Sequence, residues 1–227
     1  GERWINPGPG YLPLVGKLRK FLKKQQIDVI IDIDIVLDAL AIPATRGMKT
    51  KVVSWEHFTV DFELSSWYRR MILGYSVKRS DYVVVLTNGD FEAYRNRLGR
   101  KNAISRIYNP VAYRFDKEPV CEKKNIILTV GRLVPEKGTE YIKKVSLQIL
   151  ERYSGWQWIL LGEGTERKNL EQFIIDHHLQ NRLILKGNVE NVDEYLRKAS
   201  IFVLASQYEG MGLSMLEARE MKIPCVC

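Results

Sequence analysis

Short runs of apolar and β-branched residues alternate with segments of helical periodicity along most of the chain. In the first half these runs predict a buried strand over residues 28–36 and further strands over 51–55, 81–87 and 103–110. Amphipathic spacing predicts helices over residues 14–25, 65–79 and 91–98. Apolar strands that alternate with helices are typical of a parallel sheet covered on both faces.

The same alternation starts again in the second half of the chain. Strands are expected over residues 125–131, 156–162, 182–187, 201–206 and 223–227. Helices are expected over residues 136–153, 165–178, 192–199 and 213–221. The second half is therefore a second α/β unit of the same kind.

The stretch 111–124 is polar, contains Pro119 and shows no periodicity, so it is interpreted as a linker. We expect two Rossmann-like, doubly wound parallel-sheet domains facing a cleft, over residues 1–110 and 125–227. The first unit begins with a helix and the last strand stops at the final residue, so the chain is expected to be truncated at both ends.

Composition narrows the class of protein. The chain has 227 residues, 45% of them hydrophobic and 27% charged, which is ordinary globular composition. Three cysteines are too few for a disulfide framework, which favours a reducing compartment. No apolar run reaches about 18 residues, and no signal peptide is evident, so a cytoplasmic location is expected.

The net charge of +8 is unevenly placed. Residues 1–110 hold 18 Lys and Arg against 11 Asp and Glu, while the rest of the chain is nearly neutral. A basic half implies an anionic partner, and nucleic acid, a membrane surface and a phosphorylated substrate all qualify.

The segment from Glu209 to Glu217 carries the first chemical signal. An apolar strand leads into a loop with Gly210 and Gly212, and a helix begins near Leu213. The free N–H groups and the positive end of the helix dipole make such a junction an anion site. The two carboxylates are good acceptors for sugar or ribose hydroxyls.

The segment GRLVPEKG, residues 131–138, carries the second signal. Arg132 and Lys137 follow a buried strand directly, where parallel sheets bind ligands, and both can hold a diphosphate. No Gly-Lys-Ser/Thr follows, which excludes a Walker loop. A third glycine loop, GEG, contains Glu163 and resembles no complete dinucleotide fingerprint.

These motifs, with KGNV at 186–189 and IPCV at 223–226, resemble in order and spacing the retaining glycosyltransferases of family 4, also called group 1, which have the GT-B fold. The resemblance spans about residues 50–227. It implies transfer from a nucleotide sugar with retained anomeric configuration and without a metal or other cofactor.

The resemblance also implies roles for individual residues. Arg132 and Lys137 would hold the donor diphosphate, and Glu209 would lie by the donor sugar. The remaining donor-site residues would be Asn188 and Val189 beside the base, Gly210, Met211, Gly212 and Leu213 near the sugar and phosphate, Glu217 at the ribose, and Glu163. Glu209, Arg132 and Lys137 would be catalytic, together with His57, which lies in the family near donor sugar and acceptor.

Acceptor contacts are expected in the basic first half. Arg69 and Arg70 on the helix 65–79 could meet an acceptor phosphate or face water. Asp32 and Asp34 form an Asp-x-Asp on one face of the expected strand, and we interpret it as structural rather than metal-binding. The basic helix 14–25 fits peripheral docking on the inner face of the cell membrane.

The function predicted from the sequence is transfer of a hexose or N-acetylhexosamine, UDP-linked by preference, to a saccharide or polyprenyl-diphosphate-linked acceptor in surface polysaccharide or lipopolysaccharide synthesis. A same-fold epimerase or disaccharide synthase stays open, as does a non-catalytic lipid- or nucleic-acid-binding module. No nucleic-acid-binding motif appears, so we expect no nucleic-acid partner.

Overall fold

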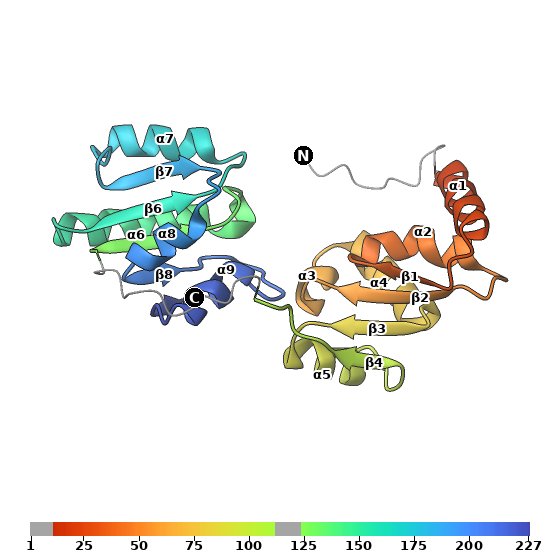
Figure 1. Ribbon diagram of the computed structural model, residues 1–227. Helices are drawn as coiled ribbons and strands as arrows, with labels where there is room; N and C mark the ends of the chain where they lie inside the picture. Colours follow the sequence, from red (N-terminus) through yellow and green to blue (C-terminus); the bar gives the residue numbers. More distant parts are fainter. Residues whose placement is uncertain (1–10, 112–123) are drawn as a thin grey trace. The chain divides into compact units, whose positions relative to one another are not determined.

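The computed structural model describes residues 11–111 and 124–227 of the chain. Contacts divide the chain into two units, Gly1–Asn109 and Pro110–Cys227 (Figure 1). The stretch expected to be a linker, 111–124, lies almost wholly outside the described residues.

Unit 1 contains a four-stranded parallel sheet in the order β1-β2-β3-β4. Its elements are α1 (Tyr11–Lys24), β1 (Val29–Asp32), α2 (Ile35–Thr45), β2 (Lys51–Glu56), α3 (Val60–Leu64), α4 (Trp67–Arg79), β3 (Tyr82–Val85), α5 (Asn88–Asn96) and β4 (Ile104–Arg106). Helices α2 to α5 contribute side chains to the main core, which packs against Val83 and Val85 of β3.

The expected buried strand over 28–36 is wrong in two respects. Strand β1 ends at Asp32, and Asp34 instead caps α2 by accepting a hydrogen bond from the Val36 N–H at 3.0 Å. Helix α2 therefore begins inside the apolar run, and the sequence pattern did not predict this helix. Strand β1 is also an edge strand of the described sheet, and Val29 and Ile31 are exposed.

Unit 2 contains a five-stranded parallel sheet in the order β7-β6-β5-β8-β9. Its elements are β5 (Ile126–Val130), the 3-10 helix η1 (Pro135–Lys137), α6 (Thr139–Arg152), β6 (Gln157–Leu161), α7 (Arg167–Asp176), β7 (Leu183–Gly187), α8 (Val192–Lys198), β8 (Ile201–Val203), α9 (Leu213–Glu220) and β9 (Cys225–Val226). Every strand and helix expected in this half is present, with the helix expected from residue 136 divided into η1 and α6.

Helices cover both faces of the sheet in unit 2, as the continuous apolar strands predicted (Figure 1). Alternate residues of β5 show how this works. Ile127 packs in one core with α6 and α7, whereas Ile126 and Leu128 pack in the other with α8 and α9. All strands run in parallel, so their carboxyl ends meet at one edge of the sheet.

The sheet of unit 1 carries polar side chains at inward positions near its carboxyl edge. Asp32 on β1 is in register with Ser54 on β2, and both are buried, as is Glu56. Ser54 Oγ lies 2.5 Å from Asp38 Oδ2 and 2.6 Å from Glu56 Oε1. A single hydroxyl proton cannot fully serve two carboxylates, which favours a protonated carboxyl at this place.

Burial disfavours the charged forms of these acids. It raises the pKa of Asp32 to about 8, with the neighbouring Asp38 as the second cause. Burial also raises the pKa of Asp38 and holds that of Glu56 well above its ordinary range, although hydrogen bonds from Ser54 oppose both shifts. Asp32 is therefore protonated at neutral pH in the folded protein.

This cluster makes the stability of unit 1 depend on pH. The pKa of Asp32 is about 8 in the folded state, above the ordinary aspartate value of 3.8. The folded state therefore binds more protons than the unfolded state between these two pH values, and the free energy of unfolding falls as pH rises from 3.8 to about 8. We expect Asp32→Asn to remove much of this fall and to stabilise the protein at pH 8 more than at pH 5. Urea denaturation at the two pH values measures it.

The matched control is Asp28→Asn, because Asp28 is exposed just before the same strand. It should leave the pH dependence unchanged. An Asp32→Asn protein that lost stability between pH 5 and pH 8 as steeply as the parent would contradict this account of the buried acids.

Candidate active site

Glycines allow the loops at the carboxyl edge of unit 2 to touch through their backbones. A Cβ on Gly162, which follows β6, would lie 2.0 Å from the carbonyl oxygen of Gly131, which follows β5. A Cβ on Gly138 would lie 1.9 Å from the carbonyl oxygen of Ala205, which follows β8, and Gly138 has a φ of +72°. No other residue fits these positions without displacing backbone, so the loops form one continuous floor.

A pocket of about 340 Å³ lies at this edge, where β5, β6 and β7 end. It is lined by Val130, Gly131, Arg132, Leu161, Gly162, Glu163, Asn188, Val189 and Val192. The structure therefore brings together four of the residues expected at the donor, although they come from three loops. The Arg132 side chain is exposed, and it has no hydrogen-bond or ion-pair partner within residues 11–111 and 124–227.

Lys137 and Glu209 form an ion pair, although they are 72 positions apart in sequence. The same Glu209 oxygen, Oε1, accepts a hydrogen bond of 2.9 Å from Ser206 Oγ, a contact that the sequence analysis missed. The backbone N–H of Gln207 donates to the Glu136 carbonyl at 2.9 Å, which joins the two loops directly. Both charged side chains keep about a quarter of their surface exposed, at 26% and 27%.

Helix α9 begins at the end of the loop that carries Glu209. Gly212 is its N-cap residue, and no side chain caps its first N–H groups. Ser214 Oγ donates to the Val130 carbonyl at 3.1 Å, which ties the start of the helix to the end of β5. The helix N-terminus thus lies at the same edge as Arg132, with Leu213 exposed beside it.

The other residues expected in this segment are placed as follows. Gly210 and Met211 lie half-buried in the loop before α9. Glu217 lies one turn inside the helix and is not among the residues that line the pocket. Burial raises the pKa of the Glu217 carboxyl.

In unit 1, His57 follows β2 directly and is half-buried. Burial lowers the pKa of His57, and the negative charge of Asp34 opposes that shift. The Trp55 ring lies 6.2 Å from the imidazole, centroid to centroid. Burial therefore favours the neutral form of the His57 imidazole relative to a histidine in water. A neutral imidazole can accept a proton.

The two arginines expected to face an acceptor or water occupy different environments. Arg70 is exposed, and its guanidinium donates to the Leu64 carbonyl at 2.9 Å. Arg69 is only 4% exposed, and its guanidinium lies 2.7 Å from the buried carboxylate of Glu63. Successive helix positions point about 100° apart, so one arginine enters the core while its neighbour stays outside. The expectation that Arg69 faces water is therefore wrong.

Helix α1 carries an exposed stripe that mixes apolar and basic residues. Leu14, Lys17, Phe21 and Lys24 are all exposed and recur at helical spacing. Next to this helix lies a second pocket of about 350 Å³, lined by Tyr11, Ala39, Pro43, Tyr68, Met71, Ile72 and Tyr75. No helix within the described ranges is long and apolar enough to cross a membrane.

The Asp-x-Asp of the first half does not form a unit. Asp32 is buried at the end of β1, whereas Asp34 caps α2, so the shared strand face expected for them is wrong. Among the residues that the structure describes, no group of three or more His, Cys, Asp or Glu side chains is arranged to hold a metal ion.

Two family models match the chain. The model described as glycosyl transferases group 1 matches residues 113–227, and the model described as glycosyltransferase family 4 matches residues 2–114. Their boundary falls within the stretch that the sequence analysis interprets as a linker.

Curated relatives are similar over nearly the whole chain. An uncharacterized glycosyltransferase of Haemophilus influenzae is 28% identical, over 95% of this chain and 61% of its own length. The lipopolysaccharide 1,6-galactosyltransferase of Escherichia coli is 26% identical, over 92% of this chain and 58% of its own length. The chain thus spans about three fifths of the length of these relatives.

Solved structures show the same architecture. HepE of Anabaena in complex with UDP and glucose has a TM-score of 0.79 at 20% identity, over 96% of this chain and 63% of that chain. The lipopolysaccharide outer core galactosyltransferase WaaB has a TM-score of 0.66 at 25% identity, over 95% of this chain and 60% of that chain. The chain has the GT-B type of fold expected from its motifs, with two parallel-sheet α/β domains.

The close backbone contacts at Gly138 and Gly162 lead to a prediction about stability. Gly138→Ala should destabilise the fold by about 1–3 kcal/mol, because the new Cβ meets the Ala205 carbonyl and the backbone φ is positive. Gly131→Ala is the matched control in the same loop, because open space surrounds its Cβ position. Urea denaturation of the two variants should separate them, and equal stabilities would contradict the packing described here.

Proposed function

Because this chain belongs to the glycosyl transferases of group 1, we propose that it forms the donor-binding and acceptor-side parts of an enzyme that moves a hexose or N-acetylhexosamine from a UDP-sugar to a saccharide or lipid-linked acceptor. The transfer retains the anomeric configuration and serves surface polysaccharide or lipopolysaccharide synthesis. The observation that carries the proposal is the meeting of Arg132, Lys137, Glu209 and the start of α9 at one edge of the sheet in unit 2.

The departing nucleoside diphosphate gains negative charge as the bond to the sugar breaks. Arg132 can grip a diphosphate in a bidentate way, and its guanidinium has no competing partner among the described side chains. Lys137 and the uncapped N–H groups of α9 add positive charge at the same edge. Such preorganised donors are commonly the largest catalytic contribution, so the enzyme needs no divalent ion for this step.

The ion pair between Lys137 and Glu209 opens when the donor arrives. Lys137 exchanges the carboxylate for a phosphate oxygen, and Glu209 is released toward the hydroxyls of the donor sugar. Because both side chains are partly exposed, water can solvate either partner, and the pair exchanges more readily than a fully buried one. Glu209 positions the sugar in this scheme, and the leaving phosphate accepts the proton of the incoming hydroxyl on the same face.

The pocket beside Arg132 fits the base end of the donor. Asn188 and Val189 line it with one amide and one apolar side chain, and Glu163 lies at its rim. Glu217 receives the ribose hydroxyls from α9. The choice of UDP has support from the similar structures of Anabaena HepE and of Staphylococcus aureus TarM, which are complexes with UDP.

Unit 1 supplies the acceptor side. His57 lies at the carboxyl edge of its sheet, with an imidazole that burial keeps neutral and able to contact the donor sugar or the acceptor hydroxyl. Arg70 is an exposed cation of α4 and can contact an acceptor phosphate. The tyrosine-lined pocket and the mixed stripe on α1 favour a lipid-linked acceptor presented at an anionic membrane surface.

Replacing the cations of the donor site should weaken nucleotide binding. We expect UDP and UDP-sugars to raise the melting temperature of the protein, and Arg132→Ala or Lys137→Ala to weaken their binding by about 10- to 100-fold, since each removes a charge-assisted hydrogen bond worth about 1.5–3 kcal/mol. Lys144→Ala, which removes an exposed charge on α6, is the control and should bind like the parent.

Transfer measured on the protein that carries this chain should be lost in Glu209→Ala while UDP still binds, and EDTA should leave the parent's activity unchanged. If no nucleoside diphosphate stabilised the protein, the donor site proposed for unit 2 would be refuted.

The mixed stripe on α1 leads to a separate prediction about membrane binding. Lys17, Lys20 and Lys24 on α1 should each contribute about 1 kcal/mol to binding of vesicles with anionic lipid. The triple change to Ala should therefore release the protein from such vesicles in a sedimentation assay, and high salt should do the same. The control triple of Lys144, Lys168 and Lys222, all exposed in unit 2, should stay bound. Binding that ignored lipid charge would rule out this docking mode.

A further inference from the structure

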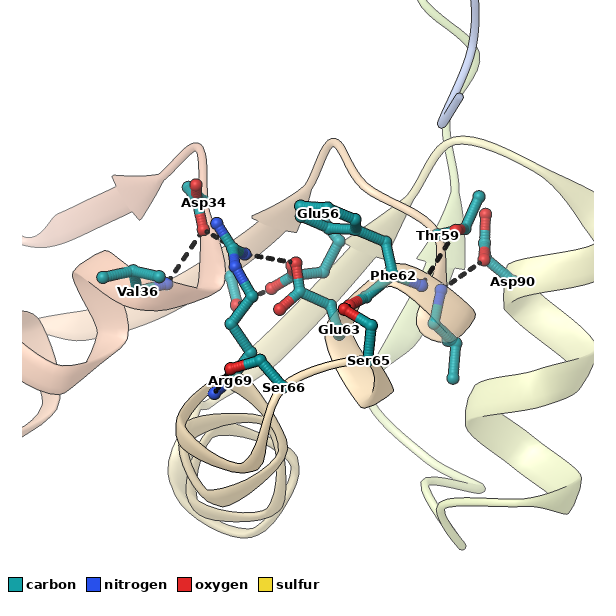
Figure 2. A network of polar contacts seen from close by, with 12 residues as sticks. Asp34, Val36, Glu56, Thr59, Phe62, Glu63, Ser65, Ser66, Arg69 and Asp90 are labelled. Atoms are coloured by element: carbon teal, nitrogen blue, oxygen red, sulfur yellow. Dashed lines mark hydrogen bonds and ion pairs between the residues drawn. The ribbon is translucent and has the colours of Figure 1, made fainter. Parts of the chain in front are cut away.

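The buried guanidinium of Arg69 connects three segments of unit 1 (Figure 2). It lies 2.7 Å from Glu63 Oε1 on α3 and 3.5 Å from Asp34 Oδ1, the cap of α2. Its flat face lies over two aromatic rings, 4.7 Å from the centroid of Phe62 and 5.3 Å from that of Phe58. Arg69 itself belongs to α4, so a single side chain joins α2, α3, α4 and the loop that precedes α3.

This loop is the one that carries His57. Phe58, its next residue, stacks on Phe62 at 4.7 Å and lies against the guanidinium. Thr59 then caps α3 by accepting a hydrogen bond from the Phe62 N–H at 3.3 Å. The Val60 N–H donates to Asp90 Oδ1 at 3.0 Å, which fixes the far end of the loop to α5 (Figure 2). Arg69 is thus the contact that holds the middle of the loop.

Four charged or titratable side chains lie on the elements around the His57 loop, and of these Asp34 acts electrostatically on the imidazole. They are Glu56 on β2, Asp34 at the start of α2, Glu63 on α3 and Arg69 on α4. Glu56 is buried with its pKa raised well above the ordinary range, and burial raises the pKa of Glu63 to about 7. Asp34 is the carboxylate whose charge acts on the imidazole, and it is also the second partner of Arg69.

We propose that Arg69 is a positioning residue for His57, which holds the loop that carries His57 and neutralises Asp34, the carboxylate that acts on the imidazole. This role rests on the proposed function, in which His57 takes part in transfer. Arg69 would set the orientation and the charge state of His57 during that step. Arg69 touches no reacting atom, and it takes no part in acceptor binding.

A purely structural role for Arg69 is the competing explanation, because Glu63 alone needs a buried partner. The two explanations differ in what they predict for His57. A structural pair would change stability alone, whereas a positioning pair would also change the titration of the imidazole through Asp34. Loss of Arg69 leaves Glu63 free to become neutral by taking up a proton, so Asp34 carries the difference in charge.

Titration of the histidines by NMR tests the proposal without any need for turnover. The chain has three histidines, and His177 and His178 lie in unit 2, where they serve as internal references. The His57 signal is assigned by its absence in His57→Gln. In Arg69→Gln we expect the pKa of His57 to rise by about one unit, because the charge of Asp34 is no longer compensated. The titration curves of His177 and His178 should be the same in Arg69→Gln as in the parent.

Asp34→Asn is the variant that guards against loss of the fold. Asn is as good a helix N-cap as Asp, so α2 keeps its first hydrogen bond. The pKa of His57 should fall in this variant, and Arg69→Gln combined with Asp34→Asn should return it toward the parent value. Arg69→Lys keeps the charge, so it should leave the His57 pKa close to that of the parent.

In transfer assays, Arg69→Gln should lower kcat several-fold at unchanged KM for the nucleotide sugar, and Arg69→Lys should recover part of it. Parent-like titration of His57 in both Arg69→Gln and Asp34→Asn would overturn the proposal. His57→Gln with full activity would instead refute the proposed role of His57, and the titration result would still stand on its own.

Discussion

The close approach of backbone to backbone at the carboxyl edge of unit 2 is the constraint on which the donor site depends. The loops after β5 and β6 touch at Gly131 and Gly162, and the loop after β8 touches Gly138. A Cβ at Gly162 or Gly138 would lie 2.0 Å or 1.9 Å from a backbone oxygen of the facing loop, so the loops would have to move apart. Arg132, Lys137 and Glu209 would then no longer meet, although none of them contacts the glycines through its own functional atoms.

The carboxyl edge of the sheet in unit 1 is stabilised by polar side chains instead of backbone contacts. This edge holds together through buried charge, with Arg69 between Glu63 and Asp34, and through the hydrogen bonds of Ser54 to Asp38 and Glu56. Buried carboxyls without a cation stay neutral, since burial disfavours the charged form. The sheet of unit 1 therefore carries polar groups inside without the penalty of several uncompensated charges.

The sequence predicts repeating local patterns well and long-range contacts poorly. Every strand of unit 2 follows from an apolar run, and the cations at Arg132 and Lys137 follow from their place after a strand. The apolar run at 28–36 predicts one strand, but its first residues form a strand and its last residues begin a helix. The boundary is the N-cap at Asp34. Neighbouring Arg69 and Arg70 look alike in sequence, and only the packing of α4 separates them. The pairing of Lys137 with Glu209 spans 72 positions, which no local pattern encodes.

The ion pairs Lys137–Glu209 and Arg69–Glu63 differ in solvent exposure. This difference favours a pair that opens in one case and a permanent contact in the other. Lys137 and Glu209 keep 26% and 27% of their side chains exposed, while Arg69 and Glu63 keep 5% and 1%. A partly exposed pair opens at a lower cost because water can solvate its partners, whereas removing one partner of a buried pair costs about 3–5 kcal/mol. In the function we propose, the first pair exchanges partners with a phosphate in every catalytic cycle. The second cannot, and a permanent contact is what the loop of His57 requires if the imidazole is to meet each substrate in the same orientation.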